Sequence, residues 1–112
     1  MYYFGNYSET LYSFEKNQNE ETLLNHKQEL ERIIAESDTR KLPVPPGIYA
    51  ELGYLNLKAN NSEKSIQLFQ AEEQLYPESS FLMGRLIQSA KAQDTAESEA
   101  SGQPVSRTPV AN

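Results

Sequence analysis

Cysteine is absent from this chain of 112 residues, and histidine occurs once. The lack of cysteine excludes disulfides, iron–sulfur clusters, thiolate zinc sites and cysteine nucleophiles. His26 cannot form a zinc site with scattered carboxylates, because such a site needs three or four ligands. We therefore predict no metal site and interpret His26 as a surface residue.

Long apolar runs and the common catalytic motifs are also missing. No stretch of about 18 apolar residues occurs, so no segment is expected to span a bilayer, and we find no signal peptide in residues 1–112. The five glycines are isolated from one another, and no nucleophile elbow is present. The adjacent pairs Glu20-Glu21 and Glu72-Glu73 would diverge by about 100° on a helix, so we interpret them as solvated. We predict no cofactor and no enzymatic activity.

Basic residues are in the minority. Ten Lys and Arg face sixteen Asp and Glu, which gives a formal net charge of −6 at pH 7. This balance argues against nucleic acid as a partner, because nucleic acid needs a basic footprint. It also argues against direct contact with an anionic membrane surface. The length allows one domain at most.

Amphipathic periodicity predicts an all-α chain with about five helices. The first helix is expected over residues 7–16, where Tyr7, Leu11 and Phe14 share one apolar face. Asn6 and Glu9 have the spacing of a capping box at its start. This helix should pair with the next one as an antiparallel hairpin.

A second helix is predicted from residue 20 to about residue 37, with Asn19 as its N-cap. Its buried stripe contains four large aliphatic residues: Leu23, Leu30, Ile33 and Ile34. Its charged residues are expected to face water: Lys27, Glu29, Glu31 and Arg32. The proline-rich residues 38–47 should form a stiff connector, with Pro46 in the first turn of the third helix.

Residues 49–77 predict two helices joined by a turn at Asn60-Asn61. The residues Tyr49-x2-Leu52-Gly53, Ser65-x3-Phe69 and Pro77 resemble a tetratricopeptide (TPR) repeat, which is about 34 residues long. We assign this TPR-like repeat to residues 46–79. Asn56 departs from the pattern, which usually has Tyr there. Gly53 lacks Cβ and should let the two helices approach closely; a generic helical hairpin is the alternative.

The fifth helix is predicted over residues 80–93 as a capping helix that covers the last apolar face of the stack. Residues 94–112 are rich in Ser, Ala, Thr and Pro and lack large apolar groups, so we predict a disordered tail. The chain then divides into an α-helical domain at 1–93 and a tail at 94–112.

Taken whole, the chain resembles a small bacterial family of TPR-like outer-membrane lipoproteins of uncharacterised function. The match is carried by residues 2–12, 30–37, 44–55 and 75–79. Members of that family carry a lipoprotein signal and a lipid-bearing cysteine ahead of the aromatic start, neither of which occurs in residues 1–112. The resemblance implies a periplasmic protein tethered to the outer membrane, with membrane contact only through the lipid anchor.

In TPR arrays the first helix of each pair lines a concave face that binds peptides or proteins. The resemblance therefore implies a candidate partner-binding surface on the third and fifth helices: Tyr54, Leu57, Lys58, Gln88 and Lys91. Tyr54 and Leu57 would form an apolar anchor if both were exposed. The sequence is equally compatible with both residues packing against the first hairpin as core.

Three aromatic residues at the start of the chain form a second candidate surface: Tyr2, Tyr3 and Phe4. They either lie on the domain or contact another chain, and a homodimer is one such contact.

From these features we predict a non-catalytic protein–protein interaction module of the bacterial cell envelope, a scaffold or assembly factor that docks partner lipoproteins. A regulator of an envelope enzyme, such as a peptidoglycan synthase activator, is the alternative. A binder of glycans or small ligands through the tyrosine-rich surface is a third.

Overall fold

The computed structural model describes residues 1–100, and the side chains of residues 1–96. Within this part of the chain the all-α prediction is confirmed, since five α-helices and one 3-10 turn are present and no strand is. In chain order the elements are α1 (Tyr7–Lys16), α2 (Glu20–Thr39), α3 (Ile48–Lys58), α4 (Ser62–Leu75), η1 (Pro77–Ser79) and α5 (Ser80–Ala100). No described helix combines the length and the hydropathy that crossing a bilayer requires.

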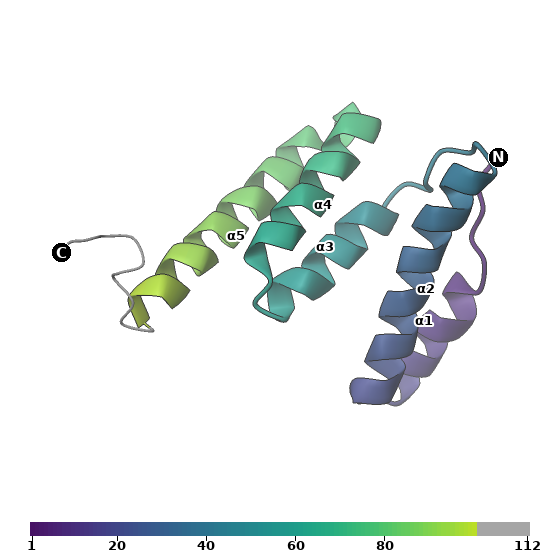
Figure 1. Ribbon diagram of the computed structural model, residues 1–112, viewed down its shortest axis with the longest axis horizontal. Coiled ribbons are helices and arrows are strands. Elements are labelled where there is room, and N and C mark those ends of the chain that lie inside the picture. Colours follow the sequence, from purple (N-terminus) through teal and green to yellow (C-terminus); the bar gives the residue numbers. More distant parts are fainter. Residues whose placement is uncertain (101–112) are drawn as a thin grey trace.

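The helices form two groups. Figure 1 shows α1 and α2 as an antiparallel hairpin at one end, and α3, α4 and α5 side by side next to it. In the second group α4 packs against both α3 and α5, whereas α3 is the helix that contacts α2. We call α1 and α2 the hairpin, and α3 to α5 the three-helix unit.

The fifth helix is longer than predicted. It continues to Ala100 rather than ending near Gln93, because Ala and Glu are strong helix formers and the added turns contain no proline or glycine. The predicted end of the fifth helix near Gln93 was therefore too early, and residues 101–112 of the predicted tail lie outside the described part of the chain.

The two helix starts of the hairpin differ in how they are capped. Asn19 caps α2 as predicted, since its Oδ1 accepts from the Thr22 N–H at 2.9 Å. The predicted Asn6–Glu9 capping box does not form. The Asn6 side chain makes no cap bond, and its backbone N–H donates to the Glu29 carboxylate of α2 at 2.7 Å.

The backbone at the start of α3 also donates to a carboxylate that is distant in the sequence. Gly47 has a left-handed φ of +93° and precedes the helix, so Pro46 lies outside its first turn, contrary to the prediction. Glu72 of α4 accepts from the Gly47 N–H at 2.9 Å and from the Ala50 N–H at 3.3 Å. Glu72 is therefore buried, not solvated as predicted, because its carboxylate accepts from N–H groups at the start of α3 that have no partner within the helix.

Close approach of α3 and α4 depends on Gly53, as predicted. A Cβ placed on Gly53 would lie 2.7 Å from Cε1 and 2.8 Å from Cδ1 of Phe69, and this ring is completely buried. Asn60 adopts a left-handed φ of +65° in the turn between these helices.

Two apolar clusters form the core. The first joins the hairpin to the three-helix unit, and its buried members are Leu30, Ile33, Val44, Ile48, Leu52 and Leu68. The second lies inside the three-helix unit, and its buried members are Leu57, Phe69, Met83 and Ala90. The capping role predicted for α5 is met only in part, because Phe81 and Leu82 at its start stay exposed.

Candidate functional site

A groove of about 410 Å³ lies between the hairpin and α3. Phe14 of α1 and Leu23 of α2 form one side of it. The α3 side and the turn after it contribute the remaining lining residues: Glu51, Tyr54, Leu55, Lys58 and Ala59. The groove is therefore mostly apolar, with one carboxylate and one ammonium group.

Four of these lining residues lie on α3 at the spacing i, i+3, i+4 and i+7, which is one helical face, and the fifth, Ala59, is the C-cap at i+8. They cover a rise of about 12 Å, at 1.5 Å for each residue. The other faces of α3 carry its buried residues, such as Leu52 and Leu57. The groove is thus built on the face of α3 that is turned toward the hairpin.

Beneath the groove a buried polar cluster joins α1, α2 and α3. His26 of α2 is only 1% exposed, so its prediction as a surface residue was wrong. Its Nε2 lies 2.7 Å from Glu51 Oε2, and its Nδ1 lies 2.8 Å from the Thr10 hydroxyl. Since the carboxylate only accepts, Nε2 carries the proton, and in the neutral ring Nδ1 accepts from Thr10. Phe14 stacks on the imidazole, with the two ring planes 5° apart.

Tyr7 completes this cluster and keeps Glu51 in place. Its hydroxyl donates to Glu51 Oε1 at 2.7 Å, so both carboxylate oxygens have a partner. Burial, together with the hydrogen bond to Glu51, raises the pKa of Tyr7 to about 12. The phenol therefore stays a donor across the physiological range, and the Glu51 wall of the groove has a fixed orientation.

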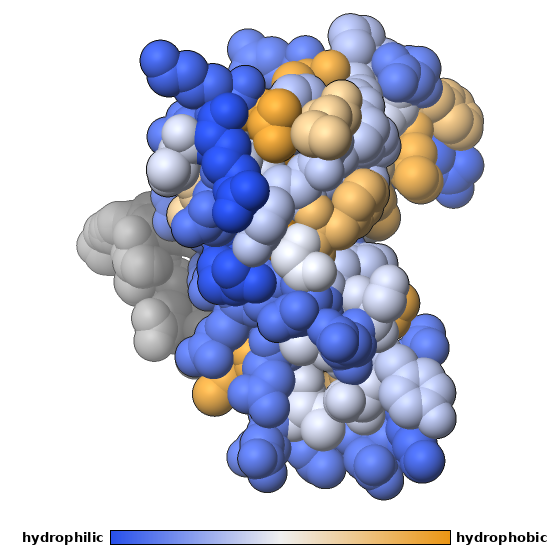
Figure 2. Space-filling model, turned by 90° about the vertical axis from the view of Figure 1, so that its right-hand side faces the viewer, coloured by the Kyte–Doolittle hydropathy of each residue, from blue (hydrophilic) through white to orange (hydrophobic). Residues whose placement is uncertain are grey.

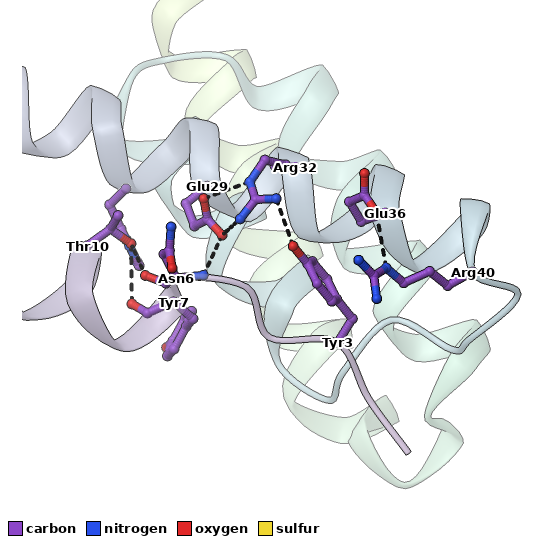
Figure 3. Close-up of polar contacts among 9 residues, drawn as sticks. Tyr3, Asn6, Tyr7, Thr10, Glu29, Arg32, Glu36 and Arg40 are labelled. Carbon is purple, nitrogen blue, oxygen red and sulfur yellow. Dashed lines mark hydrogen bonds and ion pairs between the residues drawn. The ribbon is translucent and has the colours of Figure 1, made fainter.

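A second polar cluster holds the first residues of the chain on α2 (Figure 3). Arg32 donates to Glu29 through Nε at 3.0 Å and Nη2 at 2.9 Å, and to the Tyr3 hydroxyl through Nη1 at 2.7 Å. Burial acts to raise the pKa of Glu29, but the bonds from Arg32 and the Asn6 N–H outweigh it and leave the pKa below its ordinary value. Glu29 is buried, so the prediction that it faces water was wrong.

The structure separates the residues predicted as a partner-binding surface. Tyr54 is 48% exposed, lies in the groove and has the Lys58 ammonium 5.5 Å from its ring centroid. Leu57 is not on this surface, because it is buried in the second cluster against α4 and α5. Gln88 and Lys91 are exposed on α5 but do not line the groove.

The predicted aromatic patch divides in the same way. Tyr2 and Phe4 are 41% and 48% exposed. Tyr3 packs against the first core cluster and has the Arg40 guanidinium 4.3 Å from its ring centroid. Figure 2 shows several apolar side chains at the surface in the upper half of its view, between hydrophilic ones. Tyr3 therefore anchors the chain start, while Tyr2 and Phe4 remain available at the surface.

Sequence reasoning missed the hairpin side of the groove and, on the α3 side, Glu51. Phe14 and Leu23 were assigned to core stripes, and Glu51 was not considered. Each lies at the edge of a stripe, half-buried, where local periodicity does not distinguish a groove wall from a core. Among the described residues no group of three or more His, Asp or Glu is placed to hold a metal ion.

Comparison with known proteins yields one family. A family model described as a domain of unknown function, DUF4810, matches residues 1–86. This match includes the hairpin, both sides of the groove and the first turns of α5. No curated protein and no solved structure matches the chain.

Proposed function

The chain belongs to the DUF4810 family, and we propose that it is a non-catalytic protein-interaction module that receives a segment of a partner protein between the hairpin and α3. The observation that carries this proposal is the half-exposed Tyr54 ring in a mostly apolar groove. A tyrosine in such a position supplies a large contact area at a low cost in conformational entropy, and tyrosine is common among the residues that dominate binding energy.

Preorganisation of the groove supports the proposal. The Glu51 side chain is fixed by Tyr7 and His26, and Phe14 is stacked on the imidazole. A partner would therefore meet walls that are already ordered, which lowers the entropy lost on binding.

The finer part of the proposal is that α3 and α4 are a TPR-like pair and that the protein acts as an envelope lipoprotein. The TPR-like part is supported by the close approach of Gly53 to the Phe69 ring. These two residues occupy the Gly and Phe positions of the TPR pattern. The envelope part is supported by the resemblance of residues 2–12, 30–37, 44–55 and 75–79 described above. Fractionation of cells that make the protein should recover it with outer membranes, and recovery in the cytosol contradicts the envelope part alone.

Site-specific photo-crosslinking tests the groove itself. A benzophenone amino acid at Tyr54 should give discrete crosslinked bands, whose partner is then identified by mass spectrometry. The same substitution at Tyr12 is the matched control. Tyr12 is 64% exposed on α1, has the Lys16 ammonium 5.7 Å from its ring centroid and lies outside the groove lining.

The crosslinked partner must then depend on the groove. Tyr54→Ala should reduce recovery of that partner, while Tyr12→Ala should leave recovery unchanged. Identical crosslinks from both positions, or unchanged recovery with Tyr54→Ala, would refute the groove as the docking site. The identity of the partner distinguishes a scaffold, which binds structural proteins, from a regulator, which binds an enzyme.

A further inference from the structure

The charges that line the groove are not equivalent. Both oxygens of Glu51 are already occupied by Tyr7 and His26, so this carboxylate has little need of an external donor. Lys58 contacts the ring of Tyr54 and takes part in none of the ion pairs among the described side chains. The groove therefore presents one engaged anion and one free cation.

The carbonyl oxygens of Leu55, Asn56 and Leu57 in the last turn of α3 do not add an unoccupied acceptor to the groove. Such carbonyl oxygens would attract a donor if they were unoccupied. The Leu57 carbonyl, however, accepts from Gln93 Nε2 at 2.8 Å and from the Asn60 N–H at 3.1 Å. The Leu55 and Asn56 carbonyls likewise accept backbone N–H groups of the following turn. The charged group left for a partner at this end of the groove is therefore a donor, the Lys58 ammonium.

The shape of the groove indicates the conformation of its occupant. The α3 stripe extends for about 12 Å, which is about two helical turns. A helix presents side chains on one face at i, i+3, i+4 and i+7 over the same length, whereas an extended chain covers it with about four residues. A volume of about 410 Å³ is at the small end of ligand sites, which span roughly 300–1,000 Å³, so it suits a few side chains rather than a folded surface.

We infer that the groove binds an amphipathic helix of a partner protein, with its apolar stripe against Tyr54 and Leu55 and a carboxylate paired with Lys58. This inference rests on the proposed function and adds the chemical class of the partner. The apolar stripe supplies the affinity, and the Lys58 pair selects acidic over basic partners.

Selection from a library of displayed peptides tests the inference, with the 112-residue chain as the immobilised target. Parallel selections use the unmodified chain, Lys58→Glu and Lys91→Glu. Lys91 is exposed and outside the groove, so its variant carries the same charge change without altering the site. All three targets should remain folded, as checked by thermal unfolding, because both lysines are exposed; Lys58→Glu should unfold slightly earlier, since Lys58 lies in the last turn of α3.

Peptides selected on the unmodified chain and on Lys91→Glu should combine apolar residues at i, i+3 or i+4 and i+7 with Asp or Glu. Those selected on Lys58→Glu should keep the apolar spacing and carry Lys or Arg instead. An acidic peptide should bind the unmodified chain about two- to five-fold more tightly than Lys58→Glu by fluorescence anisotropy, the ratio for a solvent-exposed ion pair. This ratio should shrink at high salt.

The other outcomes separate the inference from the proposed function. Apolar helical peptides without a charge difference between targets, or proline-rich extended peptides, would overturn the inference and leave the groove as a docking site. Failure to enrich any peptide, or binding unaffected by Tyr54→Ala, would overturn both. A dimer in sedimentation experiments that Tyr54→Ala dissociates would show that a second copy of the chain occupies the groove, and would also overturn the inference.

Discussion

The interactions inside the three-helix unit differ from those that attach α1 of the hairpin to the rest of the chain. In the three-helix unit small residues let large ones interlock: Gly53 receives Phe69, and Ala90 is completely buried beside Met83. In the hairpin α1 has no buried residue at all. Its contacts with the rest of the chain are polar as well as apolar, and they include Tyr7 and Thr10 around His26.

This difference indicates where stability and where orientation come from. Interlocking apolar groups stabilise in proportion to the area they bury and are insensitive to pH. Buried hydrogen-bonded groups contribute less net stability, but they permit only one arrangement, because any other leaves a polar atom unsatisfied. We therefore expect the three-helix unit to supply most of the stability and the hairpin contacts to set the geometry of the groove.

Removal of the Phe69 ring should have the largest effect. Phe69→Ala leaves a cavity in the second cluster and should lower the free energy of unfolding by about 3–5 kcal/mol in urea titration. Leu11→Ala is the companion change in α1, where Leu11 is only half-buried. An equal loss for both variants would contradict the contrast between the two groups of helices.

Replacement of the buried imidazole should come next. His26→Leu removes the bonds to Thr10 and Glu51 and should lower the free energy of unfolding by about 1–3 kcal/mol. His26→Gln, which retains a donor and an acceptor, should recover part of this loss. If His26→Leu were as stable as the unmodified chain, the polar cluster would not hold the hairpin on α3.

A glycine pair tests the close approach of α3 and α4. Gly53→Ala should destabilise the protein by about 1–2 kcal/mol in spite of alanine's helix propensity, because its Cβ would overlap the Phe69 ring. Gly84→Ala in α5 is the matched control, since nothing lies within 4 Å of the added Cβ. This control should stabilise the protein by about 0.5–1 kcal/mol. Equal shifts of the thermal midpoint in both variants would contradict the packing role of Gly53.

The smallest effect should be the acid response of Glu29. The pKa of Glu29 is lower in the folded chain than the ordinary 4.5. The ionised carboxylate therefore contributes its full stability above pH 4.5, and this stability is lost as the pH falls through the lowered pKa. Glu29→Gln should remove roughly 0.5–1 kcal/mol at pH 7 and flatten the stability profile below pH 4.5. Glu36→Gln, at the more exposed pair with Arg40, should cost less stability at pH 7 than Glu29→Gln.

Local patterns were sufficient to predict the helices. The bounds of α1, the Asn19 cap and the contact of Gly53 with the following helix all depend on residues less than about 20 positions apart. Periodicity and capping are interactions of this range, which is why a single sequence contains them.

The buried polar groups were not predictable in this way. His26 and Glu51 are 25 positions apart, as are Gly47 and Glu72, and Asn6 and Glu29 are 23 apart. A charged residue in a helical pattern usually faces water, and only the tertiary arrangement provides the partner that permits burial. Leu57 was misplaced for a related reason: α3 has neighbours on more than one side, so several of its faces are apolar.

The carboxylate of Glu72 has a consequence for the order in which the chain acquires structure. α3 has no side-chain cap of its own, and the acceptor for its first amides arrives 22 to 25 residues later on α4. During synthesis α3 therefore gains a satisfied start only once α4 has emerged and docked. In hydrogen–deuterium exchange we therefore expect the amide of Ala50 to report on the opening of α4, because its acceptor belongs to that helix.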